Sequence, residues 1–203
     1  MKAFTWNHPT EIVFGCGSIE NIGELTKRYG NRALLVTTGN KGKTAWVYDR
    51  IKALLDAEGI EYGHFDGVAP NPVTDIVTEG ADMAKAMSAQ VILGIGGGSS
   101  MDAAKAIAVE ASHPGTAWDY LHYKTQPTKA TLPVIAVSTT SGTGSQVTPC
   151  AVLTHTATKD KSAIWHENIY PRVAVVDPEL MTSVPSPNTA ATEIDAFAHN
   201  FEA

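Results

Sequence analysis

Short apolar runs rich in β-branched residues alternate along the chain with segments of helical periodicity. The runs lie at 11–14, 33–37, 91–94, 133–138 and 173–176. Most of them lack the polar alternation of a half-exposed strand, so we interpret them as strands buried on both faces of a sheet.

Between these runs, apolar residues recur at intervals of three and four. The intervals predict helices over 18–29, 47–58 and 74–88, and an alanine-rich helix over 101–110. The order strand, helix, strand, helix, strand, helix, strand is typical of parallel sheets covered by helices. We therefore predict an α/β fold, a Rossmann-like, doubly wound and mostly parallel sheet.

Two segments break this alternation. Residues 111–132 combine prolines with three aromatic residues and predict a long surface loop with a short helix. Residues 177–187 carry three prolines, after which a new helix is expected to start at Asn188 or Thr189. A domain boundary belongs here. We expect one domain over 1–185 and the first helix of an all-helical domain over 186–203.

The composition restricts the class of protein. The chain has 203 residues, and its 21 acidic side chains outnumber 15 basic ones, for a formal net charge of −6. An acidic chain without a basic block is a poor partner for nucleic acid or anionic membranes. No apolar run approaches the roughly 20 residues of a membrane helix, and the first residues lack the apolar run of a signal peptide. The two cysteines, Cys16 and Cys150, are too few for a disulfide framework. We expect a soluble protein of the cytoplasm that binds neither nucleic acid nor membranes.

The segment 91–102 joins a buried strand to a helix through three consecutive glycines, Gly96, Gly97 and Gly98. Glycine accepts positive φ and lets a ligand approach the backbone. The following helix points free N–H groups and the positive end of its dipole at such a ligand, and Ser99 adds a hydroxyl. This combination suits a pyrophosphate, although the spacing matches the usual dinucleotide fingerprint only in part. The alternative is a tight turn whose glycines serve packing alone.

The run at 133–138 leads into a loop dense in small hydroxyl groups. Five of the eight residues from 139 to 146 are Ser or Thr, and two are Gly. Because doubly wound sheets bind ligands at the carboxyl ends of their strands, we interpret this loop as a second ligand-binding segment. The alternative is a Ser/Thr-rich surface loop.

These motifs resemble the iron-containing (group III) alcohol dehydrogenase family. The resemblance rests on the Gly96–Ser99 turn with Asp102, on the loop 139–145, on Asp177-Pro178-Glu179-Leu180 and on the closing run 194–203. It covers essentially the whole chain, and the four motifs occur in order. Dehydroquinate synthases and glycerol dehydrogenases share the glycine turn, so that motif alone would not select the family.

The resemblance implies the residues of a cofactor site. The glycine turn is expected to hold the pyrophosphate, and Asp102 is expected to lie near the nicotinamide end as the candidate catalytic residue. The implied cofactor-binding residues are Gly97, Gly98, Ser99, Asp102, Thr139, Thr140, Thr143, Lys161 and Leu180.

Asp195 and His199 are four residues apart, which places both on one face of a helix. A carboxylate and an imidazole so placed can share one divalent cation. On spacing alone, an ordinary polar pair on an exposed helix is the alternative. The resemblance implies that they are two metal ligands, for Fe²⁺ or Zn²⁺, with two further histidines from a later helical domain. The chain thus resembles the N-terminal half of the family pattern, and we expect little or no turnover from a chain that ends at Ala203.

The first core strand is followed by Thr38, Gly39 and Asn40, and then by Lys41 and Lys43. Members of the family that prefer NAD tend to have Asp at the position matching Thr38. An acidic residue binds a ribose 2′-hydroxyl and repels a 2′-phosphate, whereas lysines can neutralise the phosphate. Thr38, Gly39 and Asn40 are therefore candidate cofactor residues, and we predict NADP rather than NAD. The alternative is that the lysines are solvated loop residues.

Together, the residues and the resemblance predict an NAD(P)-dependent and divalent-metal-dependent alcohol dehydrogenase that acts as a homodimer on a small alcohol or aldehyde. Two alternatives stay open. One is an isolated nucleotide-binding module without catalysis, and the other is a glycerol dehydrogenase-like member of the same superfamily. The loop 139–145 and the spacing of Asp195 and His199 favour the alcohol dehydrogenase branch.

Overall fold

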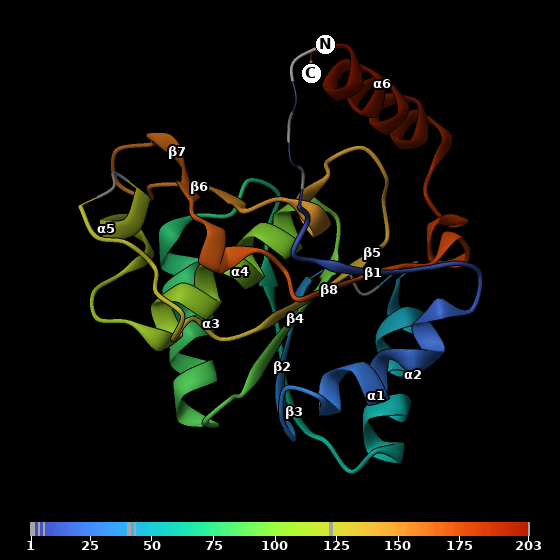
Figure 1. The fold of residues 1–203 in the computed structure, drawn as a ribbon, viewed down its shortest axis with the longest axis horizontal. Coiled ribbons are helices and arrows are strands. Elements are labelled where there is room, and N and C mark those ends of the chain that lie inside the picture. The colour runs from blue at the N-terminus through green and yellow to red at the C-terminus, as the bar shows by residue number, and fades with distance from the viewer. Residues whose placement is uncertain are drawn as a thin grey trace.

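A computed structural model of the protein describes residues 3, 5, 7–39, 42, 44–121 and 124–202 (Figure 1). Within this part of the chain, six strands form one parallel sheet in the order β1-β8-β5-β4-β2-β3, and β6 pairs with β7 in a separate antiparallel ribbon. The strands are β1 (Glu11–Phe14), β2 (Arg32–Thr38), β3 (Glu61–Val68), β4 (Val91–Gly96), β5 (Val134–Ser138), β6 (Cys150–Thr154), β7 (Lys161–Trp165) and β8 (Val173–Val176).

Helices cover both faces of the sheet, with α1 and α2 on one side and α3 and α4 on the other (Figure 1). The predicted α/β fold with a doubly wound parallel sheet is therefore confirmed. The α-helices are α1 (Ile22–Lys27), α2 (Ala45–Ala57), α3 (Thr74–Ala86), α4 (Gly98–Ser112), α5 (Ala117–Leu121) and α6 (Ser186–Glu202), and the short 3₁₀ helices are η1 (Ser18–Asn21), η2 (Ser145–Val147), η3 (Glu167–Ile169) and η4 (Pro178–Met181).

Alternate residues of the central strands serve two separate apolar cores. Leu34 of β2 belongs to the core beneath α3 and α4, together with Ile107 of α4. Its neighbour Leu35 belongs to the core beneath α1 and α2, together with Ile51 of α2. Because successive side chains of a strand point to opposite faces, an apolar run without polar alternation is what a sheet covered on both faces requires.

Three strands were not predicted from the sequence. β3 carries charged residues and glycines instead of an apolar run, and it forms the edge of the sheet beside β2, where most of its residues are only partly buried. β6 and β7 form a ribbon outside the main sheet, joined to the start of α3 by a bridge between Thr154 and Val73. An edge strand or a surface ribbon needs fewer apolar residues than a central strand, so periodicity misses it.

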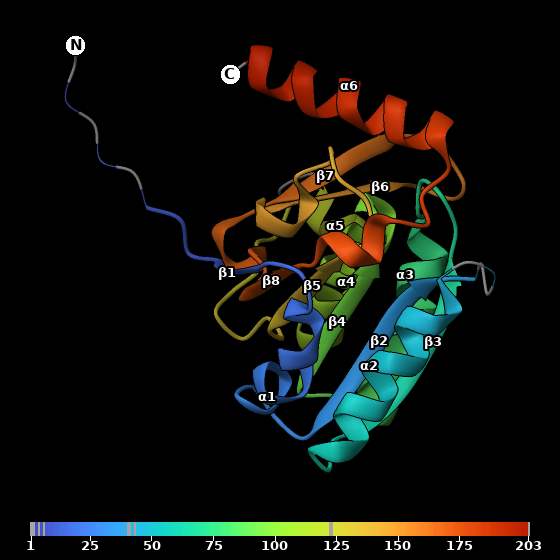
Figure 2. The ribbon, with the colours of Figure 1, turned by 90° about the vertical axis from the view of Figure 1, so that its right-hand side faces the viewer.

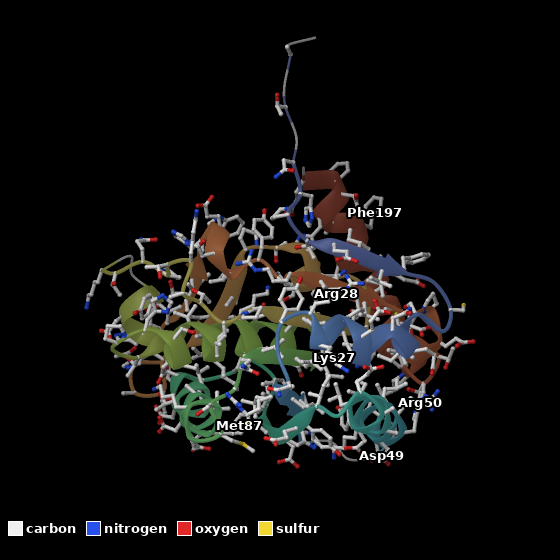
Figure 3. All side chains as sticks on the ribbon, turned by 60° about the horizontal axis from the view of Figure 1, so that its bottom comes forward. Lys27, Arg28, Asp49, Arg50, Met87 and Phe197 are labelled. Atoms are coloured by element: carbon white, nitrogen blue, oxygen red, sulfur yellow. The ribbon has the colours of Figure 1, made fainter. Side chains whose placement is uncertain are left out.

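The last helix begins earlier than the sequence indicated. α6 starts at Ser186, not at Asn188 or Thr189, because Pro187 is compatible with the first turn of a helix. None of its residues is buried, and Phe197 and Phe201 are 66% and 81% exposed. Figures 2 and 3 show α6 at one end of the molecule, apart from the other helices. The boundary between 1–185 and 186–203 stays a prediction. Across the described residues, no helix is both long enough and apolar enough to cross a membrane.

Helix α4 packs against β4 at very short range, and Gly94 makes this possible. A Cβ atom on Gly94 would lie 2.8 Å from the Ala104 Cβ and 3.1 Å from the Met101 Cα. Both atoms belong to short or main-chain groups that cannot rotate away. The position of α4, and therefore of its first residues, depends on residue 94 being a glycine, which has no side chain.

We expect Gly94→Ala to lower the free energy of unfolding by about 1–3 kcal/mol, because the added methyl overpacks the contact between strand and helix. Denaturant unfolding followed by circular dichroism measures this. Ser100→Ala is the control, because it removes a buried hydroxyl beside Gly96 at the same strand–helix junction, and this hydroxyl has no hydrogen-bond partner among the described residues. A Gly94→Ala protein as stable as the parent would contradict the close approach of α4.

Candidate functional site

The chain passes from β4 into α4 through a turn without side chains. Gly96 has a φ of 142°, a value that strongly favours glycine, and Gly97 precedes the first helical residue, Gly98. A Cβ on Gly97 would lie 3.0 Å from the Thr140 Oγ1, and one on Gly98 would lie 3.1 Å from the Thr143 Cγ2. The glycines therefore leave a narrow space between the start of α4 and the loop of residues 139–146, which we call the hydroxyl-rich loop.

The hydroxyl-rich loop is bonded directly to this turn. The Thr139 N–H donates to the Gly96 carbonyl at 3.0 Å, and the Ser138 hydroxyl donates to the Thr140 carbonyl at 2.6 Å. β4 and β5 are adjacent parallel strands, so both connections leave the same edge of the sheet. The two ligand-binding segments that the sequence predicted are thus neighbours.

A cleft of about 650 Å³ opens where these segments meet the ribbon β6–β7 and helix α6. It is lined from four sequence-distant parts of the chain. Of the predicted site residues, the structure brings together in this cleft Gly98, Ser99, Asp102, Thr143, Lys161, Asp195 and His199.

The Asp102 carboxylate ties three segments together in the wall of the cleft. It accepts hydrogen bonds from the Ser145 hydroxyl at 2.6 Å, from the Val152 N–H at 3.1 Å and from the Lys105 ammonium at 3.3 Å. Its side chain is only 15% exposed. Cys150 lines the cleft beside it, and burial raises the pKa of its thiol, which keeps the neutral form at neutral pH.

Lys161 is the first residue of β7 and lines the cleft. Its ammonium donates to the Asn71 Oδ1 at 2.9 Å, and Asn71 also lines the cleft. Asn71 has a φ of 55°, a left-handed conformation that Asn tolerates better than most residues. Sequence reasoning missed Asn71 as a site residue, although its place between two prolines marks the kind of fixed turn that can present a side chain.

Asp195 and His199 project from α6 into the cleft, with the His199 Nε2 3.6 Å from the Asp195 Oδ1. Two ligands at about 2.1 Å from one tetrahedral ion lie about 3.4 Å apart, so the pair needs little movement to share a divalent cation. A carboxylate with an imidazole suits Fe²⁺ or Zn²⁺. Among the residues that the structure describes, no third His, Cys, Asp or Glu joins the pair.

Leu180 lies elsewhere. It is 1% exposed and belongs to a second cavity of about 440 Å³, which Trp46 and Arg50 of α2 also line (Arg50 is labelled in Figure 3). The Asp177 carboxylate anchors this region by accepting from the Ile19 N–H at 3.2 Å and from the Glu179 N–H at 3.0 Å.

Of the residues predicted around the end of β2, Thr38 and Gly39 are not in the cleft lining. Thr38 is the last residue of β2. The next residue, Gly39, packs closely against β3, and a Cβ atom on Gly39 would lie 2.9 Å from the Asp66 carbonyl oxygen. Asp66 is an acidic residue, and it therefore lies near the end of β2 in space although no acidic residue is near that strand end in sequence. Only the pairing of β2 with β3 reveals this contact. Asn40, Lys41 and Lys43 lie outside the described residues.

Comparisons with known proteins agree with this arrangement. The model of the iron-containing alcohol dehydrogenase family matches residues 9–178. NADH-dependent butanol dehydrogenase A of Clostridium acetobutylicum is 36% identical over 202 residues, covering 100% of this chain and 52% of that protein. Choline dehydrogenase of Bacillus subtilis is 40% identical over 204 residues, covering 99% of this chain and 50% of that protein.

Solved structures give the same result. The crystal structure of NADH-dependent butanol dehydrogenase A from Thermotoga maritima superposes with a TM-score of 0.93 at 38% identity, covering 100% of this chain and 51% of that one. The chain spans about half the length of the curated relatives it matches. Because the family model matches most of the chain, and because the glycine turn and the paired Asp195 and His199 meet in one cleft, the chain belongs to the iron-containing alcohol dehydrogenase family.

Proposed function

We propose that the protein is an NAD(P)-dependent and divalent-metal-dependent alcohol dehydrogenase that interconverts a small alcohol and its aldehyde. One observation carries this proposal: the glycine turn at the start of α4 and the pair Asp195 and His199 line the same cleft. A dinucleotide held by the turn and a substrate held near the pair would then be neighbours.

The start of α4 suits the negatively charged pyrophosphate of the dinucleotide. The first N–H groups of a helix have no partner within the helix, and the helix dipole favours negative charge there. Gly98 allows a phosphate to reach the backbone, and the Ser99 and Thr143 hydroxyls can donate to it. The Lys161 ammonium adds positive charge from β7.

Asp195 and His199 are the residues that would hold the metal. A bound divalent ion supplies a Lewis acid for the alcohol oxygen, and a bound nicotinamide supplies the hydride acceptor. Asp102 has a different task. Since its carboxylate accepts three hydrogen bonds, it would order the wall of the cleft, and its catalytic role stays a prediction.

The relatives support this choice of chemistry. Their names include NADH-dependent butanol dehydrogenases, a choline dehydrogenase and an NAD-dependent methanol dehydrogenase, all of which act on alcohols. These names share the alcohol group and differ in the size of the substrate, which supports an alcohol as the substrate class. The homodimer stays a prediction; the exposed edge strand β1, with Ile12 and Phe14 55% and 73% exposed, is a surface that a second copy could cover.

We expect the purified protein to bind NADPH, with a rise in NADPH fluorescence on titration. Gly98→Val should weaken this binding by at least about tenfold, because a side chain there fills the space between α4 and Thr143. Gly80→Ala is the control. It crowds the buried Ile107 side chain between α3 and α4 and should lower stability without changing affinity. Equal affinities for the parent and Gly98→Val would contradict a phosphate site at this turn.

NADPH should bind more tightly than NADH, because Thr38 stands where an acidic residue would repel the 2′-phosphate. Thr38→Asp should reverse the order, lowering NADPH affinity by at least about tenfold and leaving NADH affinity little changed. Thr38→Ser is the matched neutral control. Tighter binding of NADH by the parent protein would overturn the preference and direct attention to Asp66 near Gly39.

Isothermal titration with Zn²⁺, and anaerobically with Fe²⁺, should detect a weak site that depends on Asp195 and His199. Asp195→Asn and His199→Ala should each remove the measured binding, because either change leaves one protein ligand. Glu193→Gln on the same helix is the control and should bind as the parent does. Binding that survives the loss of both ligands would place the metal elsewhere.

A further inference from the structure

The ribbon of β6 and β7 has two faces, and only one of them belongs to the apolar core. On β6, Ala151 and Leu153 are buried in the core that also holds α3 and α4 residues. Because successive side chains of a strand point to opposite faces, the residues on either side of Ala151 face the other way. These residues, Cys150 and Val152, line the cleft. The second face of the ribbon is therefore a wall of the candidate site.

Trp165 continues this wall on the neighbouring strand. It is the last residue of β7 and lies directly opposite Cys150 in the ribbon. The preceding residue, Ile164, is buried in the core, whereas Trp165 is 55% exposed and lines the cleft. A large apolar ring left in water inside a cleft is typical of a ligand-binding surface. We call Cys150, Val152 and Trp165 the apolar wall of the cleft.

Hydrogen bonds on both strands hold the apolar wall in place. The Val152 N–H donates to the Asp102 Oδ2 at 3.1 Å, which fixes β6 to α4. The His166 N–H, one residue after Trp165, donates to the Pro149 carbonyl at 3.0 Å and closes this end of the ribbon. Because the backbone is already fixed, a ligand that packs on the wall pays little for ordering it.

The polar groups of the cleft lie on other parts of its lining. The glycine turn is at the start of α4, and Asp195 and His199 are on α6. Lys161 is the first residue of β7, at the opposite end of the strand from Trp165. The groups proposed to bind the phosphate and the metal are thus separate from the apolar wall, which suits the part of a substrate that carries no polar group.

We propose that Trp165 is a specificity-determining residue that binds the carbon chain or ring of the alcohol, so that the substrate is an uncharged alcohol with an apolar tail. This inference rests on the proposed function, because it concerns the alcohol of that reaction. Burial raises the pKa of the Cys150 thiol, so the side chain opposite Trp165 is neutral and adds an apolar contact. A polyol such as glycerol would place hydroxyl groups against this wall, where they lose hydrogen bonds to water. The wall therefore discriminates against a glycerol dehydrogenase-like substrate.

The test follows the indole N–H signal of Trp165 in ¹H–¹⁵N NMR spectra of the purified protein with saturating NADPH. The signal is assigned by its loss in Trp165→Phe. Benzyl alcohol is the probe, and because NADPH and an alcohol are both reduced, no hydride transfer occurs during the titration. We expect benzyl alcohol to shift the Trp165 signal saturably, and we expect glycerol to bind at least about tenfold more weakly.

Saturation-transfer NMR of the ligand extends the comparison to the variants. Trp165→Ala should weaken benzyl alcohol binding by at least about fivefold, whereas Trp165→Phe should keep most of it because a phenyl ring still covers the wall. NADPH affinity should be unchanged in both variants, since the ring is not part of the phosphate site. The matched control is Trp46→Ala, because Trp46 is 47% exposed but lines the cavity around Leu180. It should bind benzyl alcohol as the parent does.

The outcomes separate this inference from the proposed function. If the parent does not bind NADPH, the proposed function fails. If it binds NADPH but benzyl alcohol does not shift the Trp165 signal, or if Trp165→Ala binds benzyl alcohol equally well, this inference alone is overturned. Glycerol binding as tight as that of benzyl alcohol overturns the substrate class. So does tighter binding of choline, a quaternary ammonium alcohol whose charge a Trp ring attracts. If Trp165→Ala does not fold in a thermal melt, the ring serves the fold, which also overturns the proposal.

Discussion

The close contact between β4 and α4 is the constraint on which the candidate site depends. Because Gly94 has no side chain, Ala104 and Met101 approach the strand directly, and the helix can begin at Gly98, the third glycine of the turn. The turn then leaves its N–H groups accessible and lies within hydrogen-bonding range of the loop that follows β5. A bulkier strand or turn would displace the start of α4 and separate it from Thr140 and Thr143.

The rest of the cleft is built around this helix from parts that are distant in sequence. Buried polar contacts of Asp102 and Lys105 fasten the hydroxyl-rich loop and β6 to α4. The loop in turn meets α6 at Gly142, where a Cβ would lie 2.5 Å from the Thr192 carbonyl oxygen. A chain of close contacts thus connects the glycine turn to the helix that carries Asp195 and His199, and this connection brings the two proposed binding sites into one cleft.

The sequence predicted the parts of the molecule whose burial demands an apolar pattern. Central strands such as β4, and helices such as α3, follow directly from periodicity, and the glycine turn follows from the conformations that only glycine adopts freely. Edge strand β3 and the ribbon β6–β7 escaped prediction because they are less buried. Contacts across the fold escaped it as well: Asn71 beside Lys161, Asp66 beside Gly39, and Lys105 beside Cys150 are juxtapositions that spacing along the chain does not encode.

A crystal structure of the protein grown with NADPH tests most directly whether the start of α4 binds a dinucleotide. We expect pyrophosphate oxygens at about 3 Å from the backbone nitrogens of Gly98 and Ser99, with the Thr143 hydroxyl and the Lys161 ammonium on the same ligand. NADPH bound only in the cavity around Leu180 and Trp46, with no contact to the start of α4, would contradict this assignment.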